Sequence, residues 1–163
     1  AIQAALTGHL VLSTLHTNDA PSSLTRLHDL GVQPFLTAAT ILGVLAQRLV
    51  RRLCPLCKQE TAINEQEWGH LTFDYVMDMP TMMYKAVGCE ACRHTGYKGR
   101  VGIYEFMPVS LELKSIISAH GTLNDLKAQA KKEGVEPLRI AGARKVIEGA
   151  TTLEEVLRVV PLS

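Results

Sequence analysis

Four cysteines in two tight pairs constrain this chain more than any other feature. Cys54 and Cys57 form one Cys-x-x-Cys turn, Cys89 and Cys92 form the other, and residues 58–88 separate them. Each turn directs two thiolates to one point, and two such turns complete the tetrahedral four-sulfur shell of a structural Zn²⁺ site. The chain has no other cysteine, and all four ligand positions are filled by protein. The spacing therefore predicts a structural zinc site with no open position for catalysis.

The cysteine spacing also leaves three other interpretations open, namely a disulfide framework, a redox dithiol and four unrelated core cysteines. Hydrophobic residues make up 47% of the chain and charged residues 20%, as in ordinary soluble proteins. No apolar stretch approaches the roughly 20 residues that a membrane span requires. Cysteine pairs without a recognisable export signal favour the reducing cytoplasm, where thiolates bind metal rather than each other.

The first third of the sequence alternates between strand-like and helix-like patterns. Residues 9–15 are apolar with β character and predict a buried central strand. Pro21 suits the first turn of a helix that runs to about Leu30 and stops at Gly31. A second helix is predicted to begin near Pro34, because apolar residues recur at helical spacing. These are Phe35, Ala38, Leu42, Leu45 and Leu49. The strand-then-helix order indicates an α/β layer.

The rest of the chain predicts a metal-binding insertion followed by a helical tail. Residues 64–67 should open a short helix, while residues 82–87 and 101–106 should form strands. Thr122 and Thr152 are good helix N-caps, and Thr152 with Glu155 matches a capping box. We therefore expect three consecutive segments. They are an α/β core portion at residues 1–52, a zinc-binding subdomain at 53–102, and a C-terminal strand and helical region at 103–163.

Two histidines bracket the predicted strand at the start of the chain. His9 lies at one end of it and His16 at the other, where a polar turn leads into the next helix. Ligands of open α/β sheets bind beyond the carboxyl ends of strands, so an imidazole there could contact a phosphate or polarise water. The alternative is a histidine that caps a helix or satisfies a loop.

Arginines gather on either side of the cysteine pairs. The sequence of residues 96–100 places Lys98 and Arg100 in a glycine-punctuated loop that leads into a strand, where a guanidinium could bind a phosphate. A solvated basic rim is the alternative. The formal net charge of +1 provides no electrostatic reason to bind nucleic acid. No phosphate-binding loop of the form GxxxxGK[ST] is present.

Four stretches of the chain together resemble the secretion and pilus-assembly ATPases of the bacterial type II/type IV secretion superfamily. Residues 7–20 resemble the histidine box of that family, and residues 46–57 resemble the approach to its zinc knuckle. Residues 88–92 together with residues 95–105 resemble the exit from the knuckle, and residues 142–159 resemble the C-terminal helices. The resemblance covers nearly the whole chain and is weakest over residues 58–82.

The resemblance implies the C-terminal part of a RecA-like ATPase domain with a tetracysteine zinc-binding insertion and a helical C-terminal tail. Full-length members are cytoplasmic homo-hexamers that hydrolyse ATP with Mg²⁺. They work at the inner membrane beneath a platform protein and drive assembly of pilin or pseudopilin fibres. In such an enzyme His9 and His16 would be catalytic members of the histidine box, and Arg26 and Arg100 would contact the nucleotide.

The tetracysteine element also separates branches of this superfamily, because pilus-retraction ATPases lack it. The resemblance therefore favours a type II secretion or type IV pilus extension enzyme. Without a Walker A motif, the 163-residue chain is expected to be an inactive fragment of that motor. The alternative function is a stand-alone, zinc-ribbon-like module that binds protein or nucleic acid. The near-zero net charge argues against nucleic acid.

Overall fold

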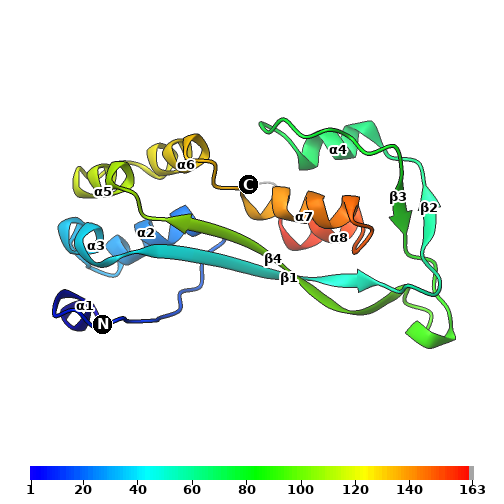
Figure 1. Cartoon of the computed structure of the whole chain (residues 1–163), viewed down its shortest axis with the longest axis horizontal. Coiled ribbons are helices and arrows are strands. Elements are labelled where there is room, and N and C mark those ends of the chain that lie inside the picture. The colour runs from blue at the N-terminus through cyan, green and yellow to red at the C-terminus, as the bar shows by residue number, and fades with distance from the viewer. Residues whose placement is uncertain (162–163) are drawn as a thin grey trace. The chain divides into compact units, whose positions relative to one another are not determined.

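The computed structural model describes residues 1–161, which fold into helices, one long two-stranded ladder and one short one (Figure 1). Contacts divide the chain into two compact units, each made of two separated stretches. Unit 1 comprises residues 1–46 and 105–136, and unit 2 comprises residues 47–104 and the chain from residue 137. The mixed helix-and-strand class predicted from the sequence is confirmed. The three consecutive segments stay a prediction.

Unit 1 is mainly helical. The helix α3 packs on α5, and α2 packs on α6. Its core includes fully buried leucine and isoleucine side chains from several helices, which are Leu24, Leu113, Ile117 and Leu126. The helices are α1 (Ile2–Leu6), α2 (Ala20–Asp29), α3 (Pro34–Thr40), α5 (Leu111–Ser118) and α6 (Leu123–Lys132).

Unit 2 combines helices with the short β2–β3 ladder and with parts of the two long strands, β1 and β4. A core cluster joins the short helix after the first cysteine pair to the last two helices, through Trp68, Leu71, Met83, Ala143, Val146, Leu153 and Val156. Its elements are β2 (Gln59–Thr61), α4 (Glu65–Leu71), β3 (Met83–Lys85), the 3₁₀ turn η1 (Glu90–Cys92), α7 (Leu138–Ile147) and α8 (Leu153–Val159). The strands β1 (Gly43–Leu53) and β4 (Tyr97–Pro108) pair with each other and belong partly to each unit.

Several local predictions are confirmed because the signals were short-range. Pro21 lies in the first turn of α2, and Gly31 follows that helix with a positive φ of 86°. The short helix and strand predicted between the cysteine pairs are α4 and β3. The hydroxyls of Thr122 and Thr152 cap α6 and α8. Among residues 1–161, no helix has both the length and the apolar character to cross a membrane.

The predicted buried strand at residues 9–15 is wrong. This segment has no regular secondary structure, and Leu10 and Leu12 are 79% and 89% exposed. In Figure 1 it is the irregular connection between α1 and α2. A central strand needs neighbouring strands on its edges, and residues 1–161 place none beside it. An apolar, β-prone sequence therefore stays without a partner here.

The helix predicted from Pro34 through Leu49 is wrong beyond its first two turns. It ends at Thr40, and β1 begins at Gly43. The apolar residues at helical spacing do not form a buried face, because Phe35, Leu42, Leu45 and Leu49 are 44–70% exposed. The loop predicted over residues 96–100 is also corrected, because β4 already starts at Tyr97.

Replacing Gly142 by alanine is expected to destabilise unit 2. A Cβ at this position in α7 would overlap a methyl group of Val156, which is fully buried on α8. Overpacking costs about 1–3 kcal/mol, which exceeds the gain of up to about 1 kcal/mol in helix propensity. The matched control is Gly69→Ala in α4, where a Cβ would meet nothing within 4 Å. In denaturant unfolding, the free energy of unfolding should be lower for Gly142→Ala than for the wild type, and equal or higher for Gly69→Ala. The reverse order would contradict this packing.

Candidate functional site

The four cysteine sulfurs converge on one point in unit 2. Cys54 Sγ lies 3.9 Å from Cys89 Sγ, and Cys92 Sγ lies 3.8 Å from both Cys57 Sγ and Cys89 Sγ. All four ligand atoms lie within 4.8 Å of one another. Zn–S bonds of about 2.3 Å directed to tetrahedral corners place neighbouring sulfurs about 3.8 Å apart. The donor set therefore fits a four-coordinate metal ion.

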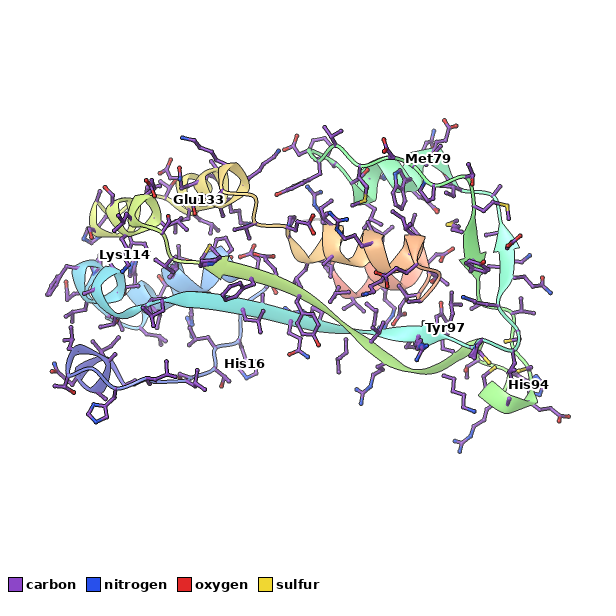
Figure 2. All side chains as sticks on the ribbon, in the orientation of Figure 1. His16, Met79, His94, Tyr97, Lys114 and Glu133 are labelled. Carbon is purple, nitrogen blue, oxygen red and sulfur yellow. The ribbon has the colours of Figure 1, made fainter. Side chains whose placement is uncertain are left out.

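The same distances argue against two of the other interpretations, the disulfide framework and the unrelated core cysteines. A disulfide needs sulfurs about 2.05 Å apart, and all four thiols are free. Unrelated core cysteines would not share one centre. Figure 2 shows a group of yellow sulfur atoms near His94. A metal-binding tetracysteine cluster is the interpretation that this geometry supports.

Backbone N–H groups donate to two of the sulfurs. Cys92 Sγ accepts from the N–H of Cys89 at 3.1 Å and of Gly96 at 3.2 Å, and Cys57 Sγ accepts from Gly88 at 3.3 Å. Burial raises the pKa of the Cys92 thiol, but the two N–H donors outweigh it and lower the pKa to about 6. Burial raises the pKa of Cys57 to about 11 despite its single donor. Cys92 is thus the sulfur best supported as a thiolate.

Glycines donate two of these three N–H···S contacts. Gly88 and Gly96 have φ values of 111° and 76°. A Cβ at Gly88 would lie 2.6 Å from the carbonyl oxygen of His94, and one at Gly96 would lie 2.6 Å from Cβ of Ala86. Side chains would therefore be strained and sterically excluded at both positions.

The two Cys-x-x-Cys turns at residues 54–57 and 89–92 form the knuckle. Residues that flank the first turn also form hydrogen bonds with the connection between the C-terminal helices of unit 2. The N–H of Leu53 donates to the carbonyl of Ala150 at 2.8 Å, and Lys58 Nζ donates to the carbonyl of Gly149 at 2.8 Å. The same ammonium lies 4.2 Å from the ring centre of Tyr84. Residues on both sides of Cys54 and Cys57 are therefore held by the turn between α7 and α8.

A second cluster in unit 2 surrounds the buried carboxylate of Glu155, which is only 1% exposed. Glu155 Oε2 accepts from Arg51 Nε at 2.9 Å and Nη2 at 2.7 Å, and Oε1 accepts from the Arg51 N–H at 3.0 Å. Arg158 adds two more bonds, at 2.9 and 2.7 Å. Burial alone would raise the pKa of Glu155, but the two guanidinium groups outweigh it and lower the pKa to about 2.

This cluster extends to the first residue of β4. The guanidinium of Arg51 lies 4.0 Å from the ring centre of Tyr97, and the Tyr97 hydroxyl lies 2.9 Å from Thr152 Oγ1. The predicted capping box at Thr152 is therefore only half formed. The Thr152 hydroxyl accepts from the Glu155 N–H, but the Glu155 carboxylate binds arginines instead of accepting from the backbone N–H of Thr152. From the sequence, Arg51 is only one of several arginines near the cysteine pairs, and its partner Glu155 was not predicted because 104 positions separate the two residues.

Three of the predicted nucleotide-site residues belong to unit 1 and are exposed. His9 Nδ1 lies 3.1 Å from Thr7 Oγ1 and 3.3 Å from the carbonyl oxygen of Ala4, at the end of α1. His16, labelled in Figure 2, lies in the irregular segment before α2, and Arg26 lies in the last turn of α2. Arg100 is exposed on β4 in unit 2.

The turn after His16 is anchored on several sides. Asp19 caps α2 by accepting from the Ser22 N–H at 2.8 Å, and its carboxylate pairs with Lys127 Nζ on α6 at 2.8 Å. Burial would raise the pKa of Asp19, but the hydrogen bonds from Lys127 and Ser22 lower it. The N–H of Ala20 donates to Oε1 of Glu105 at 2.9 Å. Sequence analysis assigned no role to Glu105, although an acidic residue in the buried register of a strand is a recognisable signal.

Comparison with known proteins places this arrangement in a family. Residues 1–158 match the family described as type II/IV secretion system protein. The chain is 72% identical over 163 residues to the type IV pilus assembly ATPase TfpB of Acinetobacter baylyi, covering all of the chain and 28% of that protein. It is 48% identical to type II secretion system protein E of Pseudomonas aeruginosa, over 98% of the chain and 31% of that protein.

A third relative gives the same result from another bacterium. The type IV pilus assembly ATPase PilB of Myxococcus xanthus is 48% identical over 96% of the chain, which covers 28% of that protein. The chain thus spans about three tenths of the length of these relatives. The match of residues 1–158 includes both cysteine pairs, His9 and His16, and the cluster around Glu155. The chain therefore belongs to the type II/IV secretion system protein family.

Proposed function

We propose that this chain is the zinc-bearing C-terminal part of a hexameric motor ATPase that drives pilin or pseudopilin assembly. The observation that supports the proposal most strongly is the match of residues 1–158 to the family, with 72% identity to a type IV pilus assembly ATPase. The fold would be the C-terminal part of a RecA-like domain. The motor would work in the cytoplasm at the inner membrane, against a platform protein.

In this proposal the chain supplies residues that contact ATP, while the phosphate-binding loop lies in another part of the full-length protein. Phosphoryl transfer with ATP and Mg²⁺ depends on positioned charges more than on covalent chemistry. The exposed cations Arg26 and Arg100 would stabilise charge on the phosphoryl oxygens. His16 would contact the γ-phosphate region from the turn before α2, and His9 would belong to the same histidine box.

The cysteine cluster would hold Zn²⁺ in a structural role. All four corners of the tetrahedron are cysteine sulfurs, so bound zinc would keep no position for water or substrate. Zinc would supply folding energy to residues 53–102, whose own apolar core is small. The N–H donors of Gly88, Cys89 and Gly96 would then offset part of the negative charge of the thiolates.

Replacing Arg100 by alanine in the full-length protein is expected to lower the turnover of ATP by about 100- to 1,000-fold, because a cation that stabilises the charge of the transition state is lost. The melting temperature should change little, since Arg100 is exposed on β4. Lys98→Ala, an exposed cation on the same strand, is the matched control and should keep near wild-type turnover. Steady-state hydrolysis and thermal unfolding measure the two quantities.

The 163-residue chain, which contains no phosphate-binding loop, is the negative control and should not hydrolyse ATP. Robust hydrolysis by this chain would contradict our placement of the active site. A large loss of folding in Arg100→Ala would make Arg100 structural. A wild-type full-length protein that does not hydrolyse ATP would refute the proposed function itself.

A further inference from the structure

Glu105 is a buried carboxylate that the proposed function leaves without a role. It lies on the inward register of β4 between Ile103 and Met107, and it is 3% exposed. A buried carboxylate is costly unless hydrogen bonds compensate it. Here Oε1 accepts from the N–H of Ala20, the first residue of α2, at 2.9 Å and across 85 positions of sequence. The bond therefore joins β4 to the start of the helix that follows His16.

The residues on the two sides of His16 are held very differently. From residue 10 to residue 16 no backbone hydrogen bond to another described residue is formed. After His16 the chain is held at Thr17, whose hydroxyl lies 2.8 Å from Ser23 Oγ. Asp19 and Ala20 provide the next two anchors, to Lys127 and Glu105. The position of His16 is thus determined from its C-terminal side, by the turn at residues 17–20.

The N-terminus of α2 is already occupied by these carboxylates. The N–H of Ala20 donates to Glu105, and the N–H of Ser22 donates to Asp19. A phosphate at a helix N-terminus needs such N–H groups and is repelled by carboxylates. The backbone of this turn consequently serves as a support, and any contact with an anion falls to side chains such as His16.

We propose that Glu105 is a positioning residue for His16: its buried carboxylate holds the first amide of α2 and so fixes the turn at residues 17–20. The role of His16 in ATP turnover rests on the proposed function, whereas the anchoring of the turn does not. Glu105 acts through the turn and contacts no nucleotide. Its removal should therefore disturb the geometry of the reaction while leaving the binding of ATP nearly intact.

The anchoring is tested on the 163-residue chain by amide hydrogen exchange. Glu105→Ala should speed exchange of the Ala20 amide by about tenfold or more, because one hydrogen bond to a charged group is lost. Glu105→Gln keeps a side-chain carbonyl oxygen for this N–H and should retain most of the protection. The matched control is Asp125→Ala, which removes a carboxylate that accepts from the Thr122 N–H at 2.8 Å, at the start of α6. It should leave the Ala20 amide unchanged.

The positioning role is tested in the full-length protein. Glu105→Ala should lower kcat by about 10- to 100-fold with little change in KM for ATP, as expected for a misplaced catalytic group. Glu105→Gln should restore most of kcat. Asp125→Ala should lower the melting temperature without this change in kcat. If Glu105→Ala does not fold, the test rests on Glu105→Gln alone. Retained protection of the Ala20 amide from exchange together with a retained kcat supports the proposal. Loss of either the protection or kcat overturns it.

The two hypotheses fail in different ways. Unchanged exchange at Ala20 in Glu105→Ala overturns the anchoring and with it this inference. Faster exchange with an unchanged kcat also overturns it, because the turn would then be irrelevant to turnover. A wild-type full-length protein without ATP hydrolysis refutes the proposed function, while the exchange result on the chain would still stand.

Discussion

Removing zinc is expected to unfold the knuckle and its subdomain at residues 53–102. The apparent binding energy of a structural zinc site is about 10–16 kcal/mol at neutral pH, which is comparable to the total stability of about 5–15 kcal/mol of a typical domain. The four sulfurs share one centre, so the turns at Cys54–Cys57 and Cys89–Cys92 are joined through it. Without metal the thiolates would repel one another or take up protons.

Metal analysis of the purified chain should find one zinc ion for each chain. Hydrogen exchange after chelation should rise steeply over residues 53–102 and much less in the helices of unit 1. Cys92→Ser should act like chelation, because Cys92 accepts two N–H donors and is one of the four proposed ligands. Glu90→Gln, an exposed change inside the same Cys-x-x-Cys turn, should retain zinc and fold. A folded, protected knuckle in Cys92→Ser would exclude a structural metal.

Loss of the Glu155 carboxylate is expected to destabilise unit 2 by about 3 kcal/mol at neutral pH. Folding lowers the pKa of Glu155 from 4.5 to about 2, and each pKa unit corresponds to about 1.4 kcal/mol. Glu155→Ala also leaves the guanidinium groups of Arg51 and Arg158, whose side chains are 47% and 60% exposed, without their shared partner. Urea unfolding of the zinc-loaded chain measures this difference in the free energy of unfolding.

The same carboxylate predicts a direction for the acid sensitivity. A group whose pKa is lower in the folded state contributes stability above its unfolded pKa and loses it as the pH falls through the folded pKa. The contribution of Glu155 should therefore be complete above about pH 4.5 and disappear towards about pH 2. Glu154→Gln, an exposed change in the same first turn of α8, is the matched control and should cost less than about 1 kcal/mol. Equal losses in the two variants would contradict a special role for Glu155.

Local signals in the sequence predicted the parts of the fold that depend on a few neighbouring residues. Pro21 and Gly31 delimit α2, and Thr122 and Thr152 cap α6 and α8, because a cap involves only the adjacent turn. The strand at residues 9–15 failed for the opposite reason. A strand is stabilised by its partners, and a β-prone sequence does not reveal whether they are present.

The cysteine pairs are the clearest case in which sequence alone determined a site. The chemistry of four thiolates at this spacing predicted a shared metal centre, and their convergence within 4.8 Å agrees with it. Only the tertiary structure showed which sulfurs receive N–H donors, since those bonds depend on the positive φ values of Gly88 and Gly96. The sequence therefore determined the ligands, and the backbone conformation decided how each one is supported.

The two buried carboxylates mark the limit of sequence reasoning in this protein. Glu155 was predicted to complete a capping box, which is a local motif, but in the structure it binds Arg51 from a distant strand. Glu105 likewise binds a distant group, the Ala20 N–H, across 85 positions of sequence. Short motifs and ligand chemistry are encoded by residue type and spacing, so the sequence determined them. Which distant partner a charged side chain meets depends on how the strands and helices pack, and only the tertiary structure decided it.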